Sequence, residues 1–101
     1  MKVLNSNEFN DAIKSGTVVV DFYADWCGPC KMLGPVMESV AEKISDVKFY
    51  KVNVDESEDV AAKYGIMSIP SVFMFKDGAL KAKSVGFMPE EEVLTWVNKN
   101  K

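Results

Sequence analysis

The chain contains no histidine and no arginine, and all 12 of its basic residues are lysines. Without histidine, it lacks the side chain that most often serves as a general base near neutral pH and as a zinc ligand. Without arginine or a lysine cluster, and with a net charge of −3, it lacks the groups that bind nucleic-acid phosphates and bases. These absences argue against nucleic-acid binding and against most histidine-based catalytic and metal sites.

Long apolar runs are also missing. No segment approaches the roughly 18 consecutive apolar residues of a membrane span, and residues 1–6 lack the apolar core of a secretory signal. With 48% hydrophobic and 27% charged residues, the 101-residue chain has the composition and length of one globular domain. We therefore expect a single domain over residues 1–101, located in the cytoplasm and not bound to a membrane.

Only two cysteines are present, and both lie in the segment Trp26-Cys27-Gly28-Pro29-Cys30-Lys31. A helical pattern follows, with apolar residues at steps of three and four as far as Ile44. This pattern places Cys30 on the core-facing side of the helix and Cys27 at its N-terminus. Free backbone N–H groups and the helix dipole favour a thiolate at that end. We therefore expect Cys27 to be exposed and ionised, and Cys30 to be shielded.

Two cysteines three residues apart have several interpretations. Structural zinc usually needs four ligands, so two chains would have to share their thiolates around zinc or an iron–sulfur cluster. Two unrelated core cysteines are another alternative. A reversible dithiol is favoured, because Gly28-Pro29 forces a tight turn between the sulfurs. In that case Cys27 attacks a substrate disulfide, and Cys30 then attacks Cys27 and releases the reduced substrate.

Strand and helix patterns alternate along the rest of the chain. We expect strands at residues 3–4, 17–24, 47–54, 71–76 and 79–85, and helices between Asn5 and Gly16, over about 30–44, between Asp55 and Gly65, and from Pro89 onward. Asn5, with Glu8 three residues later, fits a capping box for the first helix, and Asp55 can cap the third. Asp77-Gly78 is a strong hairpin signal. The order β-α-β-α-β-α-β-β-α predicts an α/β fold, with a central five-stranded mixed sheet flanked by four helices. Sites in such sheets lie at the carboxyl ends of strands, and Trp26 to Cys30 follow such an end.

An acidic residue, Asp21, interrupts the apolar run from Thr17 to Ala24. The run shows little alternation, which is typical of a strand covered on both faces. Burial disfavours a charged carboxylate and raises its pKa, and a raised pKa suits a base that works near neutral pH. The alternative is an aspartate on an edge strand that faces water.

These residues together resemble the thioredoxin family. Trp-Cys-Gly-Pro-Cys-Lys is preceded by Val-Asp-Phe-Tyr-Ala-Asp, and Lys51, Ile69-Pro70 and Gly86 stand where the family has them. The likeness extends essentially from end to end and implies the thioredoxin fold. It also implies a monomeric protein-disulfide reductase that passes electrons from a thioredoxin reductase to disulfide-containing target proteins, with no bound cofactor and no metal.

The resemblance implies roles for individual residues as well. Asp21 would transfer protons to and from Cys30, and Lys51 would modulate Asp21, although by itself Lys51 is one of 12 lysines and a solvated position is favoured. Pro70 would be a cis-proline that faces the sulfurs. A flat apolar surface for target proteins would consist of Trp26, Gly28, Pro29, Ile69, Pro70 and Gly86. The alternative for Trp26 is a place in the core, where we also expect Trp96.

Some features bear on the kind of function within the family. Tyr23 stands where tryptophan is common, and Phe87 stands where many members have a small residue, so partner preference is open. Isomerases and oxidants of this kind usually carry a histidine between the cysteines, and its absence favours a reductase. A binding subunit that uses the fold as a scaffold remains an alternative, but it would not need the intact pair Cys27 and Cys30.

Overall fold

Five strands and four helices alternate along the chain in a computed structural model that describes residues 1–101. They are β1 (Lys2–Val3), α1 (Ser6–Ile13), β2 (Thr17–Tyr23), α2 (Gly28–Lys43), β3 (Lys48–Asn53), α3 (Glu58–Lys63), β4 (Ser71–Lys76), β5 (Ala79–Val85) and α4 (Glu90–Asn100). The α/β order predicted from the sequence is confirmed. None of the helices is both long enough and apolar enough to cross a membrane.

The strands form one mixed sheet in the order β1-β3-β2-β4-β5. β2 lies at its centre, parallel to β3 and antiparallel to β4. The hairpin from β4 to β5 turns at Asp77 and Gly78, whose φ angles of 50° and 87° are both positive, as a type I′ turn requires. The carboxyl end of β2, which leads to the cysteines, therefore lies in the middle of the sheet.

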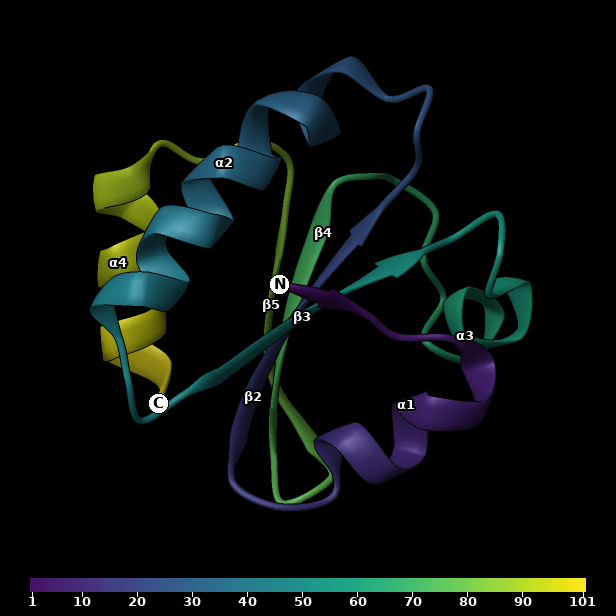
Figure 1. The fold of residues 1–101 in the computed structure, drawn as a ribbon, viewed down its shortest axis with the longest axis horizontal. Helices are drawn as coiled ribbons and strands as arrows, with labels where there is room; N and C mark the ends of the chain where they lie inside the picture. Colours follow the sequence, from purple (N-terminus) through teal and green to yellow (C-terminus); the bar gives the residue numbers. More distant parts are fainter.

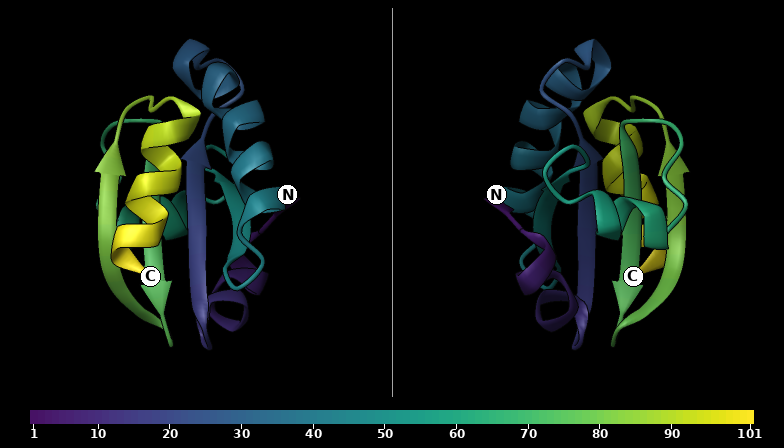
Figure 2. Two further views of the ribbon diagram at one scale, coloured as in Figure 1. Left: turned by 90° about the vertical axis from the view of Figure 1, so that its left-hand side faces the viewer. Right: turned by 90° about the vertical axis from the view of Figure 1, so that its right-hand side faces the viewer.

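Helices cover both faces of the sheet. α2 and α4 pack against one face, and α1 and α3 pack against the other (Figure 1, Figure 2). Side chains along β2 alternate between the two faces: Val19 packs with Leu33 of α2, whereas Val18, Val20 and Phe22 pack with the apolar residues of α1 and α3. All four of these β2 side chains have 0% of their surface exposed, because both faces are covered. By the same alternation, Asp21 points to the face covered by α2.

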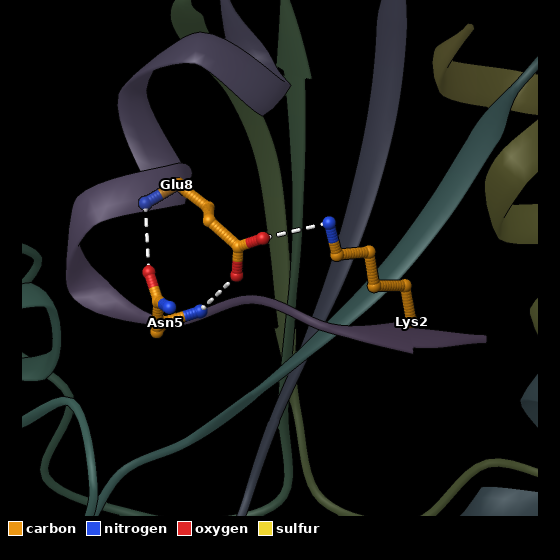
Figure 3. Close-up of polar contacts among 3 residues, drawn as sticks. All are labelled: Lys2, Asn5 and Glu8. Atoms are coloured by element: carbon orange, nitrogen blue, oxygen red, sulfur yellow. Dashed lines mark hydrogen bonds and ion pairs between the residues drawn. The ribbon is translucent and has the colours of Figure 1, made fainter.

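The start of α1 follows the sequence prediction closely. The Asn5 side chain accepts a hydrogen bond of 2.9 Å from the Glu8 N–H, and the Glu8 carboxylate accepts one of 3.0 Å from the Asn5 N–H (Figure 3). Lys2 Nζ lies 2.7 Å from the same carboxylate. This capping box satisfies two backbone N–H groups that would otherwise lack partners.

Two other helix starts differ from the sequence predictions. Asp55 does not cap α3, which begins at Glu58 after Ser57. The Asp55 N–H instead donates to the Asn53 side chain over 2.9 Å, so the chain makes a further turn before the helix. α2 begins at Gly28, two residues before the expected position, and Cys27 is its N-cap.

The last helix, α4, has Pro89 as its N-cap, and Met88 before it is buried in the core. Trp96 was also expected in the core. Trp96 is only half-buried and packs against the cluster between α2, α4 and the sheet, instead of lying fully inside it.

Candidate active site

The two cysteines lie at the start of α2, directly after the carboxyl end of β2. Cys27 is the N-cap residue, and its Sγ accepts a hydrogen bond of 3.2 Å from the Cys30 N–H. A disulfide joins the two residues, whose Cα atoms are 5.2 Å apart, a separation at which the bond forms without backbone movement. This pairing supports the redox interpretation over two unrelated core cysteines.

The expected difference in exposure between the cysteines is not found in this disulfide form. Each cysteine has only 5% of its surface exposed. The pair packs against Ala24 and Ile69, which together exclude water from the sulfurs. The prediction of an exposed Cys27 was therefore wrong for this form, because it took account of α2 alone and not of the loops that meet its first turn.

The surroundings of the two sulfurs differ nonetheless. Cys27 Sγ lies 3.9 Å from the carbonyl oxygen of Ile69, on the side where the loop before β4 approaches. Cys30 lines a cavity of about 710 Å³ that it shares with Asp21 and Lys51. Cys27 thus lies between the N-terminus of α2 and the loop before β4, where the helix dipole favours a thiolate. Cys30 lines the cavity that also contains Asp21 and Lys51.

Asp21 is buried with 2% of its surface exposed. It pairs in register with Lys51 on β3 and with Val72 on β4, so it lies on an interior strand and the edge-strand alternative is excluded. Its Oδ1 atom has no hydrogen-bond partner. Burial raises the pKa of Asp21 from 3.8 to about 7, against the opposing charge of Lys51. The predicted rise is confirmed, and this carboxyl group can gain and lose a proton near neutral pH.

Lys51 is half-buried and not fully solvated. Its Nζ atom lies 5.2 Å from the centroid of the Tyr23 ring, within the range of a cation–π contact. Tyr23, Lys51 and Asp21 all line the cavity that reaches Cys30. The structure therefore brings together around one cavity the Cys30 sulfur, the Asp21 carboxyl group and the Lys51 ammonium, as expected from the family resemblance.

Trp26 is 71% exposed, so it is not a core residue. Its indole N–H donates a hydrogen bond of 2.8 Å to the Asp55 carboxylate. Asp55 therefore belongs to the site, although its place in the sequence suggested only a helix cap. Its place near the cysteines could have been predicted from the sequence, because Asp55 follows the carboxyl end of β3. The parallel strands β2 and β3 end at the same edge of the sheet.

The other residues of the predicted apolar surface come from three separate segments. Gly28 and Pro29 are exposed at the start of α2, and Ile69 is half-buried before β4. Pro70 is buried, its peptide bond with Ile69 is cis, and its carbonyl accepts a 2.8 Å hydrogen bond from the Gly86 N–H. The first turn of α2, the loop before β4 and the loop after β5 lie at the end of the sheet where β2 leads into α2 (Figure 1).

Comparison with known proteins decides the family. A sequence model of the thioredoxin family matches residues 1–99. This chain belongs to the thioredoxin family. The thioredoxin of Chlamydia caviae is 41% identical over 100 residues, which are 99% of this chain and 98% of that one. The thioredoxin of Bacillus subtilis is 45% identical over 93 residues, covering 91% and 89% of the two chains. The solved structure of Malassezia sympodialis thioredoxin gives a TM-score of 0.91 at 34% identity and covers 98% of this chain and 91% of that one.

Thioredoxins are protein-disulfide oxidoreductases that work by dithiol–disulfide exchange, and this thioredoxin-family chain has that function. The Cys27–Cys30 disulfide fits the Cys-x-x-Cys pair on which the exchange depends. The fold and the family inferred from the sequence are therefore confirmed.

Proposed function

We propose that this chain acts as a protein-disulfide reductase with Cys27 as the attacking thiolate and Cys30 as the resolving cysteine. The observation that supports this order is the position of Cys27 as N-cap of α2, where its sulfur accepts the Cys30 N–H over 3.2 Å. A backbone N–H and the positive end of the helix dipole stabilise a thiolate more than a thiol, so they lower the pKa of a sulfur at that position. Cys30 lies within the first turn and does not accept this hydrogen bond.

The proposed reaction has two exchange steps. The Cys27 thiolate attacks one sulfur of the target disulfide, and the other sulfur leaves as a thiolate and takes a proton from solvent. Cys30 then gives its proton to the Asp21 carboxylate and attacks the Cys27 sulfur, which closes the internal disulfide. The second target sulfur leaves and is protonated. One target disulfide is reduced to two thiols, and the chain's two thiols are oxidised to one disulfide.

Proximity favours the second step. The Cα atoms of Cys27 and Cys30 are 5.2 Å apart, so the attack is effectively unimolecular once the mixed disulfide has formed. Asp21 suits the proton transfer, because burial raises its pKa to about 7 and its Oδ1 lacks another partner. In this scheme Lys51 modulates Asp21, since its positive charge favours the carboxylate.

Target proteins would bind the apolar surface formed by Trp26, Gly28, Pro29, Ile69, Pro70 and Gly86. The exposed Trp26 ring supports this assignment, because aromatic side chains dominate the energetics of many protein interfaces. Family membership supports electron supply by a thioredoxin reductase. A dithiol that reduces target disulfides has to be returned to its reduced form after each cycle, and cytosolic thiols are kept reduced, which supports a cytoplasmic location.

Reduction of insulin disulfides with dithiothreitol as the electron donor tests the proposal. We expect Cys27→Ser to be inactive and Cys30→Ser to accumulate a mixed disulfide with the target, which gel electrophoresis without reductant detects. In the reduced chain, iodoacetamide at pH 7 should label Cys27 before Cys30. Turnover by Cys27→Ser, or faster labelling of Cys30, would show that the order of attack is wrong.

A further inference from the structure

Tyr23, Lys51 and Asp21 form a cluster on the face of the sheet that α2 covers. Asp21 and Tyr23 are two positions apart on β2, so their side chains project from the same face. Lys51 lies directly opposite Asp21 in the register between β2 and β3. All three residues line the cavity that reaches Cys30. A change at any one of them therefore acts on the surroundings of the other two.

The Lys51 ammonium has two competing partners in this cluster. Adjacent strands lie about 4.8 Å apart, so the flexible lysine side chain can reach the Asp21 carboxyl group. Lys51 nevertheless takes part in none of the ion pairs of the structure, and Asp21 Oδ1 has no hydrogen-bond partner. The ammonium lies instead 5.2 Å from the centroid of the Tyr23 ring.

We propose that Tyr23 is a positioning residue for the proton transfer, because its ring holds the Lys51 ammonium away from a direct ion pair with Asp21. This inference rests on the proposed function, because it gives Tyr23 an effect on Asp21 and no direct part in the reaction with the target disulfide. A direct ion pair would favour the carboxylate and leave Asp21 a weaker base toward the Cys30 thiol. With the ammonium over the ring, only its longer-range charge acts, and burial keeps the pKa of Asp21 at about 7.

Four other side chains that can carry a charge line this cavity, but only Lys51 shifts the pKa of Asp21 by its charge. They are Asp25 after β2, and Lys31, Glu38 and Glu42 on α2. Glu38 pairs with the amino group of Met1, which also lines the cavity, and Asp25 lies 3.5 Å from the amide of Asn53. Lys31 and Asp25 are exposed to solvent, which screens their charges. Lys51 is the group whose charge lowers the pKa of Asp21.

The ring itself does not change its charge over the relevant pH range. Burial raises the pKa of the Tyr23 phenol above its ordinary value of 10.0. Tyr23 therefore stays neutral while Asp21 titrates, and its ring presents the same negative face to the ammonium throughout.

An NMR titration of the Asp21 carboxyl carbon tests the inference without requiring turnover. The disulfide form is used, so that neither cysteine titrates. We expect Tyr23→Leu to lower the pKa of Asp21 by roughly 0.5, since the released ammonium moves to the carboxylate. Tyr23→Phe, the matched control that keeps the ring, should leave this pKa unchanged. Lys51→Met should raise the pKa, and Tyr23→Leu should cause no further change in that background.

Three results would overturn the inference. They are an unchanged pKa in Tyr23→Leu, an equal fall in Tyr23→Phe, and the same fall in the Lys51→Met background. The last two would assign the effect to the hydroxyl group or to altered burial. Should Tyr23→Leu not fold, Tyr23→Met makes the same comparison. Failure of the proposed function is a separate result, because it would appear as unimpaired resolution of mixed disulfides by Asp21→Asn.

Discussion

Replacement of Asp21 by asparagine should stabilise the fold, and the gain should depend on pH. Burial raises the pKa of Asp21 from 3.8 to about 7. Each step of one in pKa corresponds to about 1.36 kcal/mol, so the ionised carboxylate costs the folded state up to about 4 kcal/mol. Asparagine has nearly the same shape and never ionises. Its amide also lacks partners at this position, so we expect a net gain of about 2–4 kcal/mol at pH 8.5.

The sign of the pH dependence follows from proton binding. Between pH 3.8 and about 7 the folded chain holds a proton on Asp21 that the unfolded chain has already lost. Stability of the unsubstituted chain therefore falls with rising pH in that window, by up to about 1.36 kcal/mol per pH unit. Below the window both states are protonated, and above it both are ionised. The advantage of Asp21→Asn should accordingly be small at pH 3.5, grow through the window and level off above pH 7.

Urea unfolding of the disulfide form, measured at pH 3.5, 5.5, 7 and 8.5, gives the free energies of unfolding for this comparison. Asp11→Asn is the matched control, because Asp11 is an exposed aspartate of α1 and the chemical change is the same. It should shift the free energy of unfolding by no more than about 0.5 kcal/mol at every pH. An equal gain from Asp21→Asn at all four pH values would refute the assignment of the cost to a buried charge. The same variant should resolve mixed disulfides more slowly, in keeping with its proposed role toward Cys30.

Two further substitutions test other parts of the structure. Asn5→Ala should lower the free energy of unfolding by about 1 kcal/mol in urea unfolding, because it removes the N-cap acceptor of α1. Asn7→Ala, on the exposed surface of the same helix, should leave the free energy of unfolding unchanged, and equal losses in the two variants would contradict the capping argument. Trp26→Ala should lower kcat/KM for insulin roughly 10-fold or more, since it removes an exposed aromatic anchor. Its turnover of a small disulfide such as hydroxyethyl disulfide should stay unchanged, and equal losses for both substrates would argue against a docking role.

The parts of the fold that depend on neighbouring residues could be predicted from the sequence. The capping box of Asn5 and Glu8 and the turn at Asp77 and Gly78 require only a few adjacent positions. The buried state of Asp21 was also predictable, because an unbroken apolar run on both sides indicates a strand covered on two faces.

Contacts between distant segments could not be predicted in this way. Asp55 looked like a helix cap, but its carboxylate accepts the indole N–H of Trp26, 29 residues away. The equal exposure of the two cysteines depends on Ile69, which only the folded sheet brings to them. The cis peptide bond before Pro70 was expected from family resemblance alone, since the peptide bond before a proline is far more often trans.

The disulfide closes a very small ring, because its two cysteines are only three positions apart. Chain-entropy arguments assign such a ring about 2 kcal/mol of stabilisation, against about 4.7 kcal/mol for a loop of 100 residues. The two large apolar clusters, of 12 and 10 buried residues, contain neither cysteine. Opening the disulfide therefore leaves the two apolar clusters intact, so the chain can accept and donate two electrons repeatedly without unfolding.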